Sequence, residues 1–254
     1  HRVDRRQRQM CIRDSLYIDR ALRDLRSVLT KEFQNLKGIT NVVDLTEAVT
    51  DVTIMISRQL REAIEDDVSD AYLNGARSAY ADAPGLGVKS YNRDDYDLED
   101  IRVLQHNGPL GLALGNFERD LNTEMNKVIF EAAATNVAMA NMVDQVRAVA
   151  NTQAWKLGRI ARTEMLNIFN EGRFRGYAKA EQKLGDRFKY SLQIISDNRT
   201  CGAHLELSGR IPAGGMHLDE LIQLQQSIGA SYNFTLTGKA LLHPNQRTVL
   251  VMVK

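Results

Sequence analysis

Residues 153–184 read QAWKLGRIARTEMLNIFNEGRFRGYAKAEQKL, a run without proline in which apolar residues recur every three or four positions. At 100° per residue, this spacing predicts one long α-helix with large side chains on two nearly opposite faces. One face holds Leu157, Ala161, Met165, Ile168 and Gly172, and the other holds Trp155, Arg159, Arg162, Leu166, Phe169, Arg173 and Tyr177. Since both faces carry apolar bulk, we predict that this helix lies at the centre of a bundle, with arginine stems packed along aromatic rings.

The helical pattern extends upstream as far as Leu16. A first stripe consists of Leu22, Leu25, Leu29, Phe33 and Leu36 and ends at Lys37-Gly38. A second helix, which we expect Asp44 to cap, carries the stripe Leu45, Val49, Val52, Ile56, Leu60, Ile64, Val68 and Tyr72 and ends within ADAPGLG (81–87). A third helix starts with Phe117, Leu121, Met125, Val128 and Ala132 and continues through the small residues of 132–150. Stripes this narrow require packing partners.

Residues 85–110 form a polar connector between the second and third helices. A short helix is expected near 98–104, within a loop that we expect to be mobile. The acidic segment NRDDYDLED (92–100) lacks the regular oxygen-ligand spacing of a calcium loop. We therefore interpret its carboxylates as solvated surface.

The pattern changes after Gly185. The segments RFKYSLQIIS (187–196) and QRTVLVMVK (246–254) are rich in β-branched and aromatic residues and predict two strands. A short helix is expected at about 217–228. The predicted fold class is mainly α with a small C-terminal α+β domain: an elongated helical domain at 16–184, followed by a compact strand-turn-helix-strand domain at 185–254.

The first fifteen residues are treated separately, because RRQRQMCIRDS (5–15) resembles the in-frame translation of a sequencing-library adapter. We interpret residues 1–15 as such an artefact or as a disordered arm; a natural basic tail that binds nucleic acid is the alternative. Without Arg2, Arg5, Arg6, Arg8, Arg13, Asp4 and Asp14, the 33 basic and 32 acidic residues become 28 and 30, a net charge of −2. The charge then gives no support for DNA binding.

Several classes of site find no support in the sequence. No apolar run is long enough to span a membrane, and the first residues do not resemble a secretory signal. The glycine-rich segments GLALG and PAGG do not match a phosphate-binding loop. We see no convincing catalytic centre and expect the protein not to be an enzyme.

Cys201 and His204 form a C-x-x-H pair, and His243 lies 39 residues beyond His204. Sulfur and imidazole nitrogen are zinc ligands, so these three residues could bind zinc, with His217 or Asp197 as a distant fourth ligand. A thiolate activated by imidazole is a second interpretation. The third is that Cys201 is a small buried apolar residue.

The arginine and aromatic face of residues 153–184 also has two interpretations. Arg159, Arg162 and Arg173, alternating with Trp155, Phe169 and Tyr177, could form a surface for nucleic acid. Alternatively, the face packs internally and is rimmed by ion pairs to residues such as Glu164 or Glu171. Aromatic stripes at helical period usually lie in a core, so the spacing favours internal packing.

Three segments, IARTEMLNIFNEGRFRGY (160–177), SDNRTCGAHLELSGRI (196–211) and LLHPNQRT (241–248), together resemble the phage Mu F-like minor head proteins, also called phage head morphogenesis proteins. The matching residues are Arg162, Thr163, Glu164, Asp197, Arg199, Thr200, Cys201, Gly209, His243, Pro244, Asn245 and Arg247. The chain departs from the family pattern at His204, Gln246 and Thr248, where the family has further cysteines. Glutamine and threonine are poor zinc ligands, so any metal site formed by Cys201, His204 and His243 is degenerate, and no cofactor is expected.

The resemblance implies a structural role for these residues. The turn at Cys201 would close against the His243 strand as a clasp, with Asp197 and Thr200 holding the turn by hydrogen bonds and Gly209 supplying backbone freedom. It also implies a minor capsid protein of a tailed phage or prophage that acts in head morphogenesis by binding portal, capsid or scaffold subunits. Such a protein is located in the virion, at the capsid interior or portal vertex, and in the host cytoplasm during assembly.

Two further functions stay open at this point. Mu F-like domains also occur ahead of effector enzymes, so the chain could be such a toxin-associated module without its effector. A zinc-dependent nucleic-acid-binding protein is the third hypothesis. The oligomeric state and the natural N-terminus do not follow from the sequence.

Overall fold

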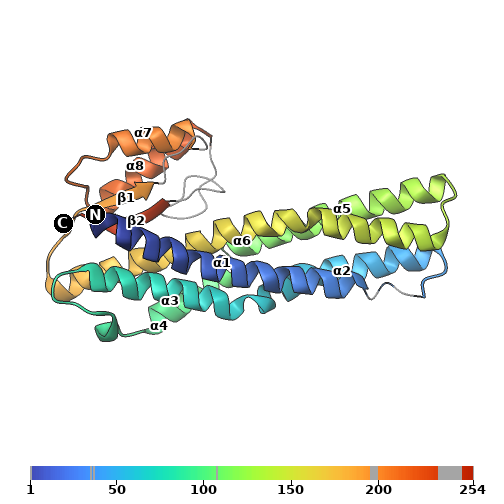
Figure 1. Ribbon diagram of the computed structural model, residues 1–254, viewed down its shortest axis with the longest axis horizontal. Coiled ribbons are helices and arrows are strands. Elements are labelled where there is room, and N and C mark those ends of the chain that lie inside the picture. Colours follow the sequence, from blue (N-terminus) through green and yellow to red (C-terminus); the bar gives the residue numbers. More distant parts are fainter. Residues whose placement is uncertain are drawn as a thin grey trace. The chain divides into compact units, whose positions relative to one another are not determined.

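A computed structural model of the chain describes residues 2–34, 36, 38–106, 108–194, 200–233 and 248–253, with side chains from residue 18 onward. The helices are α1 (Arg2–Gln34), α2 (Val42–Ala63), α3 (Glu65–Asp82), the 3-10 helix η1 (Val88–Ser90), α4 (Asp95–His106), α5 (Pro109–Ala134), α6 (Met139–Leu184), α7 (Gly202–Arg210) and α8 (Leu218–Ser231). The strands β1 (Tyr190–Ile194) and β2 (Thr248–Met252) form an antiparallel pair. The predicted fold class, mainly α with a small C-terminal α+β part, is confirmed (Figure 1).

The second predicted helix is divided in two at Ile64. Its backbone leaves the helical region there, with φ −116° and ψ 14°, and three carboxylates of α3 follow at Glu65, Asp66 and Asp67. Acidic side chains stabilise the first turn of a helix through its dipole, which favours a new start at this position. Ile64 and Val68 are both fully buried, so the predicted apolar stripe continues across the break.

The cap of α2 is Asn41 rather than Asp44, which corrects the sequence-based prediction. The Asn41 side-chain oxygen accepts a hydrogen bond from the Asp44 backbone N–H at 2.9 Å. The Asn41 amide in turn donates to the Asp44 carboxylate at 2.7 Å. Asp44 therefore lies in the first turn, where its negative charge faces the positive end of the helix dipole.

The third predicted helix ends earlier than expected. α5 stops at Ala134, and Asn136 adopts a left-handed conformation with φ 53° before α6 begins at Met139. Asparagine tolerates this conformation better than most residues. The small residues of 139–150 therefore belong to α6, which begins well before the predicted residue 153.

The contacts group the chain into two compact units. The first comprises His1–Asp67 and Leu104–Ala161, and the second comprises Val68–Val103 and Arg162–Lys254. The change from helices to strands does occur near the predicted residue 185, but the contacts place residues 185–254 in one unit with most of α3 and the second half of α6.

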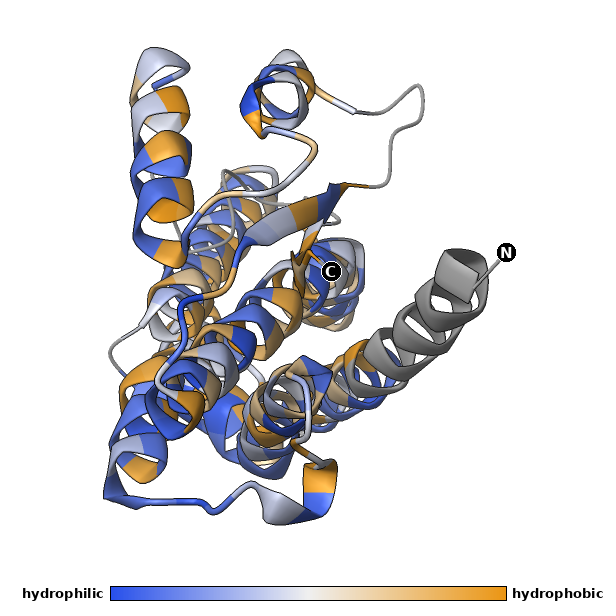
Figure 2. Ribbon diagram, turned by 90° about the vertical axis from the view of Figure 1, so that its left-hand side faces the viewer, coloured by the Kyte–Doolittle hydropathy of each residue, from blue (hydrophilic) through white to orange (hydrophobic). Residues whose placement is uncertain are grey.

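The first unit is built from helices whose predicted stripes are buried, and in it α2 packs against both α1 and α5. Figure 2 shows hydrophobic and hydrophilic residues interspersed along the helices of the chain. The buried residues include Leu25, Leu29, Phe33, Leu45, Val49, Ile56, Leu60, Phe117, Leu121, Met125, Val146 and Leu157. Arg147 of α6 donates to the carbonyls of Phe33 at 3.3 Å and Leu36 at 2.8 Å. This guanidinium thus satisfies carbonyl groups at the end of α1 that have no partner within the helix.

In the second unit, α3 and α6 cross in backbone contact. A Cβ atom placed on Gly172 would lie 2.0 Å from the Tyr72 carbonyl oxygen, and one on Gly176 would lie 2.1 Å from that of Ala76. From the other helix, a Cβ on Gly75 would lie 2.1 Å from the Phe169 oxygen. Only glycine fits at these three positions, because any side chain would overlap a main-chain carbonyl.

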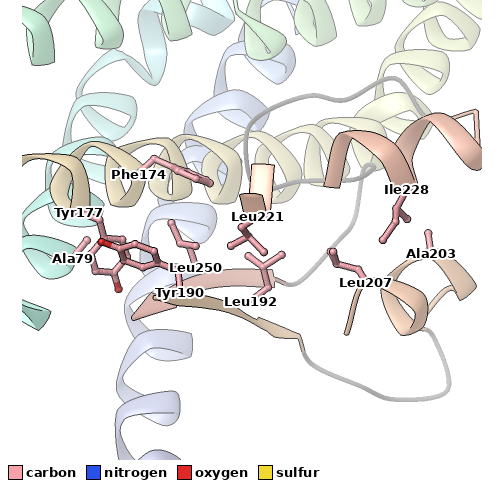
Figure 3. Packing of buried hydrophobic residues seen from close by; sticks show 10 residues of the cluster. All are labelled: Ala79, Phe174, Tyr177, Tyr190, Leu192, Ala203, Leu207, Leu221, Ile228 and Leu250. Carbon is pink, nitrogen blue, oxygen red and sulfur yellow. The ribbon is translucent and has the colours of Figure 1, made fainter. Parts of the chain in front are cut away.

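The two strands complete the core of the second unit. Their register pairs Tyr190 with Met252 and Leu192 with Leu250. Figure 3 shows ten buried side chains converging from six elements: Ala79 of α3, Phe174 and Tyr177 of α6, Tyr190 and Leu192 of β1, Ala203 and Leu207 of α7, Leu221 and Ile228 of α8, and Leu250 of β2. At the start of β1, the Tyr190 and Met216 backbones exchange hydrogen bonds of 2.7 and 2.9 Å. Gly215, with φ +73°, allows the chain to turn at this bridge.

Among the described residues, no helix combines the length and the apolar composition that crossing a membrane requires.

The glycine crossing yields a stability prediction. We expect Gly172→Ala to lower the free energy of unfolding by at least about 2 kcal/mol, because the methyl group must push α3 and α6 apart. Urea denaturation followed by circular dichroism measures this. Gly115→Ala in α5 is the matched control, because a Cβ there has no atom within 4 Å, and alanine is the better helix former by about 0.5–1 kcal/mol. Equal effects of the two substitutions would contradict the close crossing.

Candidate functional site

The C-terminal strand is held along its outer edge by side chains of α6. Asn170 donates to the Thr248 carbonyl at 2.9 Å and accepts from the Leu250 N–H at 3.2 Å. Arg173 donates to the Leu250 carbonyl at 2.5 Å, and the Tyr177 hydroxyl accepts from the Met252 N–H at 3.0 Å. These α6 residues are separated by three and four positions, so they lie on one face of the helix. They provide hydrogen bonds that a third strand would otherwise make.

Arg173 connects three elements of this site, because it lies on α6 and forms hydrogen bonds to both β2 and α3. Its side chain is 1% exposed and donates to Asp82 at 2.8 Å and Ser78 at 2.9 Å, both on α3. Tyr177 also donates to Asp82 at 2.8 Å, and burial raises the pKa of Tyr177 well above its usual value. A buried guanidinium is tolerated only when its donors are satisfied, and here α3, α6 and β2 all supply partners.

The internal-packing interpretation of the arginine and aromatic face is confirmed for its C-terminal half. Phe169, Arg173 and Tyr177 are all buried, and the ion-pair partner of Arg173 is Asp82 rather than Glu164 or Glu171. In the other unit, Trp155 is 54% exposed, with the Arg159 guanidinium 5.0 Å from its ring centroid. The buried half of the face is therefore not accessible to a nucleic acid.

The acidic segment 92–100, which leads into α4 and includes its first residues, is not uniformly solvated surface, which corrects the sequence-based interpretation. Asp97 is fully buried and accepts hydrogen bonds from Tyr91 at 2.9 Å and Lys179 at 2.7 Å. Arg175 lies 3.3 Å from Asp97 and 3.1 Å from Asp94. These ion pairs tie the acidic middle of the 85–110 connector to α6.

Asp94 and Asp97 also cap α4. The Asp94 carboxylate accepts from the Asp97 N–H at 3.1 Å, and the Asp97 carboxylate accepts from the Asp94 N–H at 3.0 Å. This reciprocal pair is a capping box with aspartate in place of glutamate. Desolvation acts to raise the pKa of Asp94, but hydrogen bonds from Lys179, the Asp97 N–H and Arg175 outweigh it and hold the pKa at about 2.

The Arg162-Thr163-Glu164 segment lies on α6 in the second unit. Arg162 is exposed, whereas Thr163 and Glu164 are buried. Burial raises the pKa of Glu164 to about 7, against the opposing effect of a hydrogen bond with Asn167. Among the described residues, the Glu164 Oε2 atom has no hydrogen-bond partner. The carboxyl group is therefore held where its neutral form is favoured.

Cys201 lies at the start of a helix rather than in an open turn. It is the N-cap residue of α7, and its Sγ atom is 3.0 Å from His204 Nδ1, one turn into the helix. His204 is 4% exposed. The Tyr232 hydroxyl lies close to Gly202, and Glu206 forms a 2.7 Å ion pair with Arg210. The thiol and the imidazole of the C-x-x-H pair therefore lie in direct contact.

The expectation for Gly209 needs correction, and most of the other expectations about this segment concern residues outside the described ranges. Gly209 is inside α7 without a positive φ, and a Cβ there would meet nothing within 4 Å, so Gly209 supplies no special backbone freedom. Thr200 immediately precedes the N-cap of α7. Asp197, Arg199, His243, Pro244, Asn245 and Arg247 lie outside the described residues, and so does the expected closure of Cys201 against His243.

Within the described ranges, no group of three or more histidine, cysteine, aspartate or glutamate side chains is arranged to hold a metal ion. The proposed third zinc ligand, His243, lies outside these ranges.

Sequence reasoning missed the role of Asn170 and assigned no partner on β2 to Arg173 or Tyr177. The available signal was three polar-tipped side chains at positions 170, 173 and 177 in a stretch that is otherwise suited to burial. A buried helix face that carries hydrogen-bonding groups needs polar partners. The backbone edge of a strand is one such partner, but the pattern does not say which strand.

Comparison of the chain with known proteins finds no matching family model, no similar curated protein and no similar solved structure.

The contacts of Asn170 predict how firmly β2 is held. We expect Asn170→Ala to lower the free energy of unfolding by about 2–4 kcal/mol, because a buried N–H and a buried carbonyl of β2 lose their partner. Hydrogen exchange should show the Leu250 amide losing protection before the rest of the core. Asn126→Ala is the control, because among the residues that the structure describes the Asn126 side chain bonds to Asn122 of the same helix; its cost should stay below about 1 kcal/mol. Unchanged Leu250 protection in Asn170→Ala would contradict the assignment.

Glu164 predicts an unusual dependence of stability on pH. In the folded state the pKa of the Glu164 carboxyl group is about 7, whereas its usual pKa is 4.5. Between these two values the folded state keeps a proton that the unfolded state has lost, so the free energy of unfolding should fall as pH rises from about 4.5 to 7. We expect Glu164→Gln to be more stable than wild type by about 1–3 kcal/mol at pH 8 and close to wild type at pH 4.5. Urea denaturation at the two pH values measures the difference. A variant that is less stable at pH 8 would show that the carboxylate is stabilised instead.

Proposed function

We propose that this protein is a structural minor head protein of a tailed phage or prophage, which acts in head morphogenesis by binding portal or capsid subunits and not by catalysis. The proposal starts from the resemblance of three segments to the Mu F-like minor head proteins. It assigns the protein to the virion, with assembly taking place in the host cytoplasm.

One observation carries the argument for a structural role. The segment 160–177 carries the first part of the resemblance. Its polar side chain Asn170 forms hydrogen bonds to β2, and Arg173 forms hydrogen bonds to β2 and an ion pair with α3. Arg175 is likewise occupied by the carboxylates of the α4 cap. Side chains engaged in this way stabilise a fold and are not available to a substrate. The segment is therefore best explained as the signature of a fold.

The surface of the first unit suggests how such a protein docks. Leu112 and Phe130 of α5 are 68% and 77% exposed. They are 18 residues apart, which is five helical turns, so they lie on the same face of α5 at a separation of about 27 Å. Large apolar side chains on a surface are favourable anchors for a protein partner.

The test is co-purification with the portal protein encoded near the gene for this chain. We expect a stable complex at micromolar concentration, and we expect Leu112→Ser/Phe130→Ser to reduce the recovered complex at least roughly tenfold, because buried apolar anchors dominate interfaces. Glu124→Ala, an exposed polar position on the same helix, is the matched control. Circular dichroism should show that both variants keep the wild-type melting temperature.

The possible results distinguish a failure of the proposed function from a failure of the proposed interface on α5. Absence of any complex with portal, capsid or scaffold proteins at micromolar concentration would contradict the proposed function. A complex that survives the double substitution would keep the function and move the interface away from this face of α5.

A further inference from the structure

The contacts of β2 form a site that recognises an extended backbone. This strand-binding site consists of Asn170, Arg173 and Tyr177 of α6 together with the edge of β1. Alternate residues of a strand direct their backbone groups to opposite edges. Thr248, Leu250 and Met252 are bonded by α6, whereas Val253 donates to the Lys189 carbonyl at 2.8 Å on the β1 side. β2 is thus held on both edges by other parts of the chain.

Most of the recognition is independent of the side chains of β2. The α6 residues bond only main-chain N–H and carbonyl groups of Thr248, Leu250 and Met252. The exceptions are Leu250, which is fully buried in the cluster with Phe174, Tyr177 and Leu192 (Figure 3), and Thr248, which is fully buried as well. The site therefore accepts an extended segment with an apolar residue at its centre. The segment TVLVM fits it well, since β-branched residues favour extended backbone.

The site requires an occupant. If β2 left, Asn170 and Arg173 would lose their main-chain partners, and the apolar cluster around Leu250 would be uncovered, which is unfavourable. Any segment that replaces β2 must therefore restore the same hydrogen bonds. The segment best matched to do so is another copy of β2.

The connection to β2 is long enough for the strand to reach a neighbouring molecule. Residues 234–247 separate α8 and its cap from β2, and these 14 residues can span at most about 50 Å. We propose that the strand-binding site also accepts β2 of a second copy of this chain, so that two copies exchange their C-terminal strands. The contacts at each site are the same in the monomer and in the exchanged dimer, as in domain swapping. This inference does not depend on the proposed function.

The exchange is tested by disulfide trapping in the full chain, in a Cys11→Ser/Cys201→Ser background. Ser191 and Val251 are partners across the β1–β2 pair, and both are half-buried. One preparation carries Ser191→Cys and the other carries Val251→Cys; the two are unfolded in urea, mixed, refolded and oxidised. A disulfide-linked heterodimer on non-reducing gels, in excess of random cross-linking, shows that β2 of one copy pairs with β1 of another.

We expect the ratio of linked dimer to monomer to rise roughly tenfold when the protein concentration at refolding rises from about 10 to about 100 µM, because a tethered strand competes with a free one. The Ser191→Cys/Val251→Cys double variant is the positive control and should form an intramolecular disulfide at low concentration. Val251→Cys mixed with Glu124→Cys, an exposed position in the first unit, measures random cross-linking.

A linked heterodimer no more abundant than the Glu124→Cys control, at every concentration and with the intramolecular disulfide forming normally, would overturn the proposal. If the Ser191 and Val251 variants lose their helical circular dichroism signal, the pair Gln193 and Val249, also partners in the register, replaces them. The same comparison with that pair then decides between exchange and a strand that stays in its own chain.

Discussion

The second unit depends on one buried guanidinium. Arg173 is almost completely excluded from solvent, yet its donors reach Asp82 and Ser78 on α3, Tyr177 on α6 and the Leu250 carbonyl on β2. A charge in this position is tolerated only if all of these elements are in place together, because an unpaired buried cation is very costly. The Arg173 network therefore couples the last strand of the chain to a helix that ends more than 160 residues earlier.

The glycine crossing makes this network possible. Gly75, Gly172 and Gly176 let α3 and α6 approach until their backbones touch. At that separation, Asp82 and Ser78 come within hydrogen-bonding distance of Arg173. Asn170 and Tyr177 then extend the same helix face along the free edge of β2, so a two-stranded sheet gains hydrogen bonds that it cannot make by itself. The same face of α6 therefore packs closely against α3 and forms hydrogen bonds with the edge of β2.

Periodicity and propensity predicted much of the fold. Most residues of the stripes of α1, α2 and α5 are buried as expected, with Leu22, Val52 and Val128 half-buried, and the two predicted strands pair. Cys201 and His204, which were expected in a turn, instead meet at the start of α7, because residues three apart are neighbours on a helix. The break at Ile64 was missed, since its apolar side chain continues the stripe of a single long helix. Asp97 was assigned to the surface because an acidic segment is usually solvated; its burial depends on Arg175 and Lys179, some eighty residues away.

The sequence by itself determined the two strands, most of the helical segments and which of their faces are apolar, because these properties follow from residues within a few turns of one another. It did not determine the short helix α7, which was expected as a turn. Only the tertiary structure decided where the polar side chains on those faces find partners. A helical pattern shows that Asn170, Arg173 and Tyr177 share a face, but it does not show that the face meets the edge of a strand near residue 250. Hydrogen bonds between segments far apart in the sequence depend on how the chain is folded in space. The spacing of residues within one helix carries no information about which distant segment comes close to it.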